Sequence, residues 1–288
     1  MIPARRKIAA ATIAAATASL LAAAKLIVGV LTGSLAVIAT GVDSLMDVAC
    51  SGLNAYFLRI AAEGPDAEHA YGHGKAEALS GVIQATIITM GGVWLISRGV
   101  RRLLAPEPIA SPGAGIVVSA AAFVVSLGLV WFLRREARIT QSIALHADAF
   151  HYVTDIATNT VAGVALVLYR YSGLTWVDPV ASLLIAVYVI RASVDIVREA
   201  ADELLDRGLP HSVEDDVKRI LKGFAPEVRG YRAFRSRRAG GTQFVEFNLL
   251  VERSTSFERA HDLAEDAVSR IRERHGESTQ VMVHTDPV

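Results

Sequence analysis

Six apolar segments follow one another through the first two thirds of the chain, and no other feature constrains the fold as strongly. The first begins after the basic residues Arg5, Arg6 and Lys7 and extends to residue 31. The other five cover residues 34–58, 78–96, 116–133, 142–169 and 176–190. Most approach the roughly 20 apolar residues that a helix needs to cross a bilayer. Together with a hydrophobic content of 52%, this pattern predicts an α-helical membrane protein with six transmembrane helices.

The distribution of basic residues predicts how these helices are oriented. A basic N-terminus favours a cytoplasmic start, and the arginines between 134 and 138 then also fall inside, whereas those between 98 and 102 fall outside and count against it. A secretory signal peptide is the alternative for the first segment. We disfavour it because Lys25 interrupts the segment and further apolar segments follow. We expect a multi-pass protein of the inner membrane with both termini in the cytoplasm.

The character of the sequence changes near residue 207, where the apolar segments end. We therefore predict a transmembrane domain at 1–207 and a small cytoplasmic α+β domain at 208–288. The predicted elements are a helix at 211–224, strands at 228–238 and 242–252, a helix after Thr255 and a strand at 280–284. The two glycines before residue 242 are typical of a hairpin turn. Thr255 and Glu258 have the spacing of a capping box for the second helix.

Charged residues inside two of the apolar segments are the strongest indication of function. Asp43 and Asp47 are four residues apart in one segment, and His151 and Asp155 are four apart in another. Residues at this spacing share one face of a helix. Ionisable groups in a bilayer are costly and are usually functional. Three carboxylates and one imidazole suit Zn²⁺, and also Cd²⁺, Co²⁺, Fe²⁺ or Mn²⁺, so we predict a metal site.

Simpler interpretations of these residues remain open. The four could form a structural polar network, with Lys25 as a counter-ion to one carboxylate. Asp148, one turn before His151, could be a relay on the entry path or a solvated residue near the start of its helix. Cys50, the only cysteine, could lie near the metal, but a small packed thiol is the simpler reading.

A second cluster of possible ligands lies between the second and third segments. Asp66, His69 and His73 combine a His-x-x-x-His spacing with an acid three residues upstream, which is a credible metal site. The alternative is a polar loop at the membrane edge in which the histidines are incidental. The net charge of zero offers no argument for nucleic-acid binding, and no prosthetic group is expected.

Several motifs together resemble the cation diffusion facilitator family, in particular its bacterial ferrous-iron and zinc efflux proteins. They are the segments 43–47, 71–77, 151–155, 204–207 and 284–287. The resemblance implies a homodimeric, six-span metal/proton antiporter in the lipid membrane, with a metallochaperone-like αββαβ cytoplasmic domain. The implied ligands are Asp43, Asp47, His151 and Asp155 for transport, and Asp66, His69 and His73 in the loop. Lys75 and Asp206 match a pair that interlocks the dimer.

The cytoplasmic domain departs from the family pattern. His261, His284 and Asp286 match ligands of metal ions at the dimer interface, but Arg232 and Asn248 stand where histidine is expected. Arginine cannot ligate a metal, and asparagine is a poor zinc ligand. At most a partial site is therefore expected, and Arg232 could instead pair with Asp286. Dimerisation through packing and ion pairs alone is the alternative.

These observations predict a divalent metal exporter, with Zn²⁺ as the favoured cargo and protons as the exchanged ion. Because protons and metal compete for the same carboxylates and imidazole, protonation on one side can eject the metal. Export of Fe²⁺, Cd²⁺, Mn²⁺, Co²⁺ or Ni²⁺ is the alternative. A membrane metal hydrolase would need an open coordination position and a general base, and the chain has no His-Glu-x-x-His motif. A membrane metal sensor that does not transport is the other rival.

Overall fold

The computed structural model describes residues 2–33, 35–104, 116–172 and 176–288. It divides into two compact units, Met1–Ala201 and Asp202–Val288. The predicted boundary at residue 207 lies six positions later than this division, because the last long helix continues into the second unit. We describe each unit by itself.

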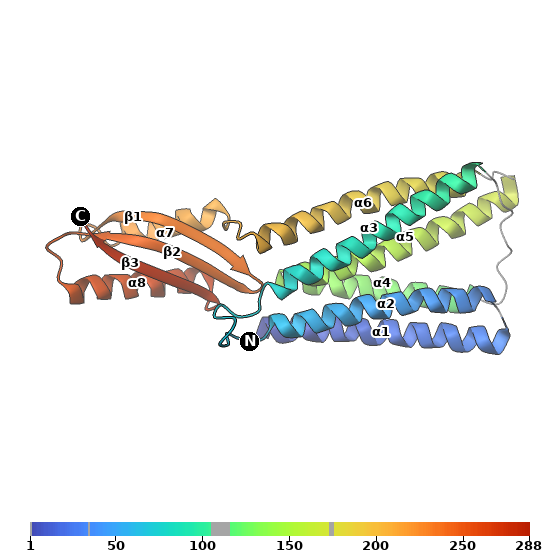
Figure 1. Cartoon of the computed structure of the whole chain (residues 1–288), viewed down its shortest axis with the longest axis horizontal. Helices are drawn as coiled ribbons and strands as arrows, with labels where there is room; N and C mark the ends of the chain where they lie inside the picture. The colour runs from blue at the N-terminus through green and yellow to red at the C-terminus, as the bar shows by residue number, and fades with distance from the viewer. Residues whose placement is uncertain (1, 34, 105–115, 173–175) are drawn as a thin grey trace. The chain divides into compact units, whose positions relative to one another are not determined.

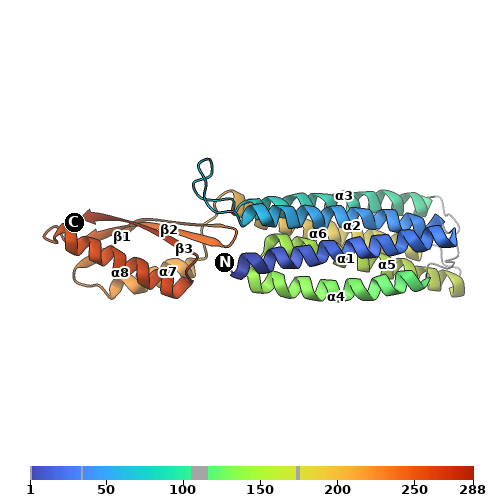
Figure 2. The same cartoon turned by 90° about the horizontal axis from the view of Figure 1, so that it is seen from below.

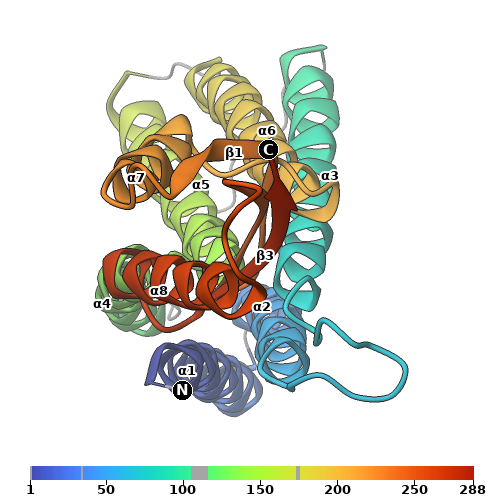
Figure 3. The ribbon, with the colours of Figure 1, turned by 90° about the vertical axis from the view of Figure 1, so that its left-hand side faces the viewer.

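Six long helices make up the described part of the first unit (Figure 1). They are α1 (Ile2–Thr32), α2 (Leu35–Ala61), α3 (Ala76–Leu104), α4 (Ile116–Thr140), α5 (Ile143–Ser172) and α6 (Val177–Leu204). By length and composition alone, three of the described helices are apolar enough to cross a membrane: Ala4–Thr32, Ala76–Leu104 and Pro179–Leu204. Helix α5 packs against α3 and α4 and also meets α1 and α2, while α2 lies directly beside α3 (Figure 3). Helix α5 can therefore bring its side chains against several neighbours at once.

The sixth helix is longer than the sequence pattern predicted. The predicted apolar segment ends at residue 190, where charged residues follow, but α6 runs on to Leu204. Asp195 and Arg198 form an ion pair one turn apart, with side chains 76% and 74% exposed. Charges on the outer face of a helix end its apolar character without ending the helix itself.

The second unit, all of whose residues are described, is an αββαβ domain. Its elements are α7 (His211–Lys222), β1 (Val228–Ala239), β2 (Thr242–Val251), α8 (Phe257–His275) and β3 (Thr279–Pro287). The strands form one sheet in the order β1-β2-β3, antiparallel between β1 and β2 and parallel between β2 and β3. Both helices pack on one face of the sheet (Figure 2). The predicted order of elements is confirmed.

The core of this domain follows the alternation of its central strand. Val245, Phe247 and Leu249 are buried against the helices, together with the α8 residues Leu263 and Ile271. Because neighbouring residues of a strand point to opposite faces, the even-numbered residues of β2 face away from the helices. This second face of the sheet carries the polar residues discussed below.

The start of α8 differs from the predicted capping box. The N-cap residue is Ser256, whose hydroxyl accepts a hydrogen bond from the backbone N–H of Arg259. The backbone N–H of Thr255 instead donates to Glu252 O in a turn. The residue with the extended backbone that caps the helix is therefore Ser256, one position later than predicted. The hairpin at 239–241 is confirmed, since Ala239 pairs with Thr242 across it.

The contact between α7 and α8 predicts a pH-dependent stability. Asp216 on α7 accepts a hydrogen bond from Arg274 Nε of α8 at 3.1 Å and pairs with Arg219 at 2.8 Å. The hydrogen bond from Arg274, and then the charges of Arg274, Arg219 and His275, hold the pKa of Asp216 below its ordinary value. The ionised carboxylate therefore stabilises the fold above the unfolded pKa of about 3.9. This contribution is lost as pH falls through the folded pKa.

We expect Asp216→Asn to speed hydrogen exchange of α7 and α8 amides in the full chain at pH 7. The difference from wild type should shrink as the pH falls below about 4 toward the folded pKa, because the unfolded chain then binds a proton at Asp216 that the folded chain does not. A difference that stays constant down to pH 3 would show that the ion pairs do not supply the stability.

Candidate metal-transport site

The first unit brings three of the predicted metal ligands together where α2 meets α5. Asp47 lies on α2, and His151 and Asp155 lie one turn apart on α5. The Nε2 atom of His151 is 3.2 Å from Asp47 Oδ1 and 3.7 Å from Asp155 Oδ2. One ligand atom of each residue lies within 4.8 Å of those of the others. Because one ring nitrogen faces both carboxylates, a cation bound there would have nitrogen and oxygen ligands of the kind that zinc accepts.

The fourth predicted ligand, Asp43, lies outside this group. It precedes Asp47 by one turn on α2, and its side chain is exposed. Spacing alone places both carboxylates on one face of the helix, but the packing of α2 against α5 brings only Asp47 to His151. A role for Asp43 in the transport site therefore stays a prediction.

A buried hydrogen-bonded chain adjoins the three ligands. Asp148 is fully buried, and its Oδ1 accepts a hydrogen bond from Ser51 Oγ at 3.0 Å. The same hydroxyl lies 2.9 Å from the hydroxyl of Tyr152, so Tyr152 can donate to Ser51 while Ser51 donates to Asp148. The interpretation of Asp148 as a solvated residue is wrong, because α2 covers it. These hydrogen bonds between Ser51, Asp148 and Tyr152 connect α2 to α5 next to the metal ligands.

Lys25 and Cys50, for which the sequence left simpler interpretations open, both contact or lie among neighbouring helices. Lys25 on α1 donates to Ser44 Oγ on α2 at 2.6 Å. Cys50 is buried with 3% of its surface exposed, which agrees with a packed thiol.

Several buried polar residues on α2 and α3 escaped the sequence analysis. Ser80 Oγ donates to Asn54 Oδ1 at 3.0 Å, and Asn54 Nδ2 donates to Ala144 O at 3.3 Å. Gln84 is buried as well. A signal for Asn54 exists in the sequence: Asp47, Ser51 and Asn54 recur at spacings of four and three, which places them on one helix face.

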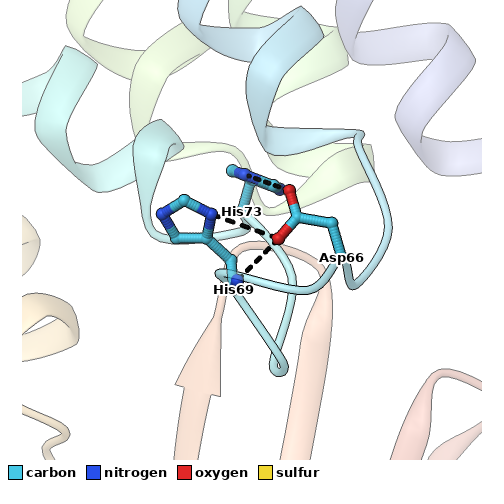
Figure 4. Close-up of side chains that lie close together, drawn as sticks. All are labelled: Asp66, His69 and His73. Carbon is cyan, nitrogen blue, oxygen red and sulfur yellow. Dashed lines mark hydrogen bonds and ion pairs between the residues drawn. The ribbon is translucent and has the colours of Figure 1, made fainter.

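The loop residues predicted as a second site also lie together (Figure 4). Asp66 Oδ1 is 3.3 Å from His69 Nδ1, and Asp66 Oδ2 is 3.5 Å from His73 Nε2. Gly72 turns the chain between the histidines with a φ of +77°, and its N–H donates to His69 O at 2.9 Å. The Nδ1 atom of His73 lies 3.4 Å from Gly64 O. A hydrogen bond from Nδ1 to that carbonyl would leave Nε2 free to ligate a metal.

The loop acid is held in its ionised form by the backbone. The N–H of His69 donates to Asp66 Oδ1 at 2.6 Å, and that of Glu68 at 2.9 Å. These bonds, that of His69 foremost, keep the pKa of Asp66 below its ordinary value, and the charges of His69 and His73 act in the same direction. An ionised carboxylate between two imidazoles is a suitable partial ligand set for a divalent metal.

The predicted ligands of the second unit are only partly assembled. His284 Nε2 lies 3.2 Å from Asp286 Oδ1, and His261 lies exposed on α8. Among the residues described for this unit, no three His, Cys, Asp or Glu side chains bring ligand atoms within 4.8 Å of one another.

Asp206 accepts a hydrogen bond from Arg237 at 3.2 Å. Its predicted interlock with Lys75 in the dimer stays a prediction.

Family models match almost the whole chain. Residues 11–205 match the cation efflux transmembrane domain, and residues 209–288 match the cytoplasmic domain of cation efflux proteins. The chain belongs to the cation efflux family, whose members are transporters and not enzymes. It is a divalent cation efflux protein with a six-helix transmembrane domain and a cytoplasmic C-terminal dimerisation domain, and this implies a homodimer. The predicted family and fold class are confirmed.

Bacterial relatives are similar over nearly their full length. The cation-efflux pump FieF of Klebsiella pneumoniae is 36% identical over 278 residues, which cover 96% of this chain and 92% of the relative. FieF of Cronobacter sakazakii is 37% identical over the same shares. Among solved structures, the metal-bound C-terminal domain of the CzcD transporter from Thermotoga maritima is 27% identical. The match covers 26% of this chain and 87% of that one, with a TM-score of 0.25.

Proposed function

We propose that this protein exports Zn²⁺ from the cytoplasm in exchange for protons. The observation that carries the proposal is the contact of Asp47, His151 and Asp155 between two helices of the transmembrane domain. One imidazole and two carboxylates form a borderline ligand set that suits zinc. The names of the FieF relatives, which are cation-efflux pumps, support the direction of transport.

The same ligand set supports coupling to protons. Metal binding requires a neutral imidazole and ionised carboxylates, so the groups that hold the cation release protons when it arrives and take them up when it leaves. A site that alternates between the two sides of the membrane then exchanges one ion for the other. We propose that the protein lies in the inner membrane and that both of its termini are in the cytoplasm.

The loop cluster of Asp66, His69 and His73 is a second proposed metal site. Three ligand groups and an exposed position favour reversible binding, since the fourth position is left to water. We propose that it takes the same cation as the transport site.

Transport in proteoliposomes tests the proposed function. We expect uptake of Zn²⁺ to be accompanied by a rise of internal pH, because protons leave as zinc enters, and to exceed uptake of Cd²⁺, Fe²⁺, Mn²⁺, Co²⁺ and Ni²⁺. Faster movement of another cation would reassign the cargo. Metal uptake without any pH change would refute antiport, and tight binding without uptake would favour a sensor.

A further inference from the structure

A cluster of polar side chains lies on the face of the cytoplasmic sheet that α7 and α8 leave open. Arg232 on β1 pairs in register with Asn248 on β2, and Asn248 lies beside His284 on β3. Asp286 follows two positions later on β3, so its side chain points to the same face. All three strands therefore contribute to one cluster, which we call the Arg232 cluster: Arg232, Asn248, His284 and Asp286.

Asp286 is the centre of the Arg232 cluster, and protein donors surround it. Its Oδ2 accepts hydrogen bonds from Arg232 Nε at 2.9 Å and Asn248 Nδ2 at 2.7 Å, and lies 2.8 Å from Arg232 Nη2. Its Oδ1 lies 3.2 Å from His284 Nε2. The side chain of Asp286 is only 15% exposed, whereas that of Arg232 is 61% exposed. The guanidinium therefore covers the carboxylate from the solvent side.

The electrostatics of the Arg232 cluster are those of a satisfied ion pair. The hydrogen bond from Asn248, followed by the hydrogen bond and charge of Arg232, holds the pKa of Asp286 below its ordinary value. Asp286 is thus ionised at neutral pH, and one guanidinium balances its charge. Charge-assisted hydrogen bonds of this kind are among the stronger ones in proteins.

A divalent metal fits this cluster poorly. A metal needs lone pairs on Asp286, but three nitrogen atoms of Arg232 and Asn248 already occupy Oδ2, which leaves only Oδ1 beside His284. The amide of Asn248 turns its NH₂ group, which has no lone pair to offer, toward the carboxylate. An arriving cation would also meet the positive charge of Arg232, which stays protonated in proteins. Binding would have to break the ion pair first.

We propose that Arg232 serves as a built-in cation of the cytoplasmic domain, taking the position at Asp286 that a divalent metal would otherwise fill. The face of the sheet around Asp286 consequently binds no metal ion, and metal in the cytoplasm does not change the conformation of this domain through the Arg232 cluster. The ion pair holds β1 to β3 across β2 whether metal is scarce or abundant. This inference concerns the cytoplasmic domain alone and does not depend on which metal the transmembrane site carries.

Zinc stoichiometry of the purified full chain in detergent tests the proposal. We expect His284→Ala, which removes an exposed imidazole, to leave the number of bound zinc ions per chain unchanged. We expect the double variant Arg232→His with Asn248→His to bind one additional zinc ion per chain. Arg229→His is the matched control, because Arg229 lies on the same strand and pairs with Glu252 instead. It should add none.

Hydrogen exchange of β3 provides an independent readout. Zinc should leave the exchange of β3 amides unchanged in the wild-type chain and slow it at least tenfold in the double variant. Loss of a bound zinc ion in His284→Ala would overturn the proposal, since the native domain would then hold metal. A folded double variant that gains no zinc would also overturn it, because Arg232 would not be what excludes the metal. Flux through the transmembrane site enters neither comparison.

Discussion

Replacing Asp155 by alanine is expected to abolish metal-driven proton flux in proteoliposomes, with a fall in rate of about a hundredfold or more. The carboxylate is one of three ligands that meet between α2 and α5, and its removal takes away both a metal ligand and a negative charge. Loss of a mere supporting partner of a ligand already costs about 10- to 100-fold in metal affinity or activity. Asp47→Ala should have an effect of the same size.

The matched control for these variants is Asp195→Ala. Asp195 is also a carboxylate on a helix of the transmembrane domain, but it is exposed and pairs only one turn along α6 with Arg198. Its flux should equal that of wild type. Unchanged flux in folded Asp155→Ala protein would refute the assignment of the transport site. Asp43→Ala should reduce flux less than Asp47→Ala, and an equal loss would mean that all four predicted residues ligate at once.

Replacing Glu77 by alanine is expected to destabilise the transmembrane domain by about 3–5 kcal/mol. Glu77 on α3 accepts a hydrogen bond from Lys7 on α1 at 2.7 Å, and their side chains are 4% and 6% exposed. Removing one partner of a buried ion pair leaves the other charge without compensation, which accounts for the large loss. The free energy of unfolding in mixed micelles with a denaturing detergent measures the effect.

A double substitution separates the net contribution of this ion pair to the free energy of unfolding from the destabilisation caused by a buried charge that has lost its partner. Lys7→Met combined with Glu77→Leu removes both charges and keeps similar volume, and such replacements are often neutral or stabilising. We therefore expect the double variant to be far more stable than Glu77→Ala. Asp195→Ala, which breaks an exposed pair, should change stability by at most about 1 kcal/mol. A double variant as unstable as Glu77→Ala would mean that packing, not charge, explains the loss.

The buried pair also shows where the sequence is a poor guide. Lys7 stands in a basic N-terminal group that reads as a topology signal, and nothing in its neighbourhood points to a partner 70 positions away. Arg6 beside it donates two hydrogen bonds to Glu136 on α4, at 3.0 Å each. Together they tie the start of α1 to two other helices. Such pairings depend on which helices lie side by side, and this is a property of the packed bundle.

The cytoplasmic domain was more accessible to prediction because its signals are local. Alternation along β2 and the glycines after β1 define a hairpin within a few residues of one another, and the apolar spacing of α8 defines its buried face. The sequence leaves the pairing of Arg232 with Asp286 open. It depends on the parallel alignment of β2 with β3, which sets residues far apart in the chain beside each other.

The sequence by itself determined which segments are apolar and helical, and that His151 and Asp155 share a helix face, because a spacing of four residues returns to the same side of any α-helix. It also determined the family through motifs spread along the chain. Only the tertiary structure decided that Asp47 and not Asp43 contacts His151, that Asp148 is covered, and that a guanidinium occupies Asp286. The rotation of each helix about its own axis and the register of each strand are set by packing against neighbours, and spacing within one element carries no record of them.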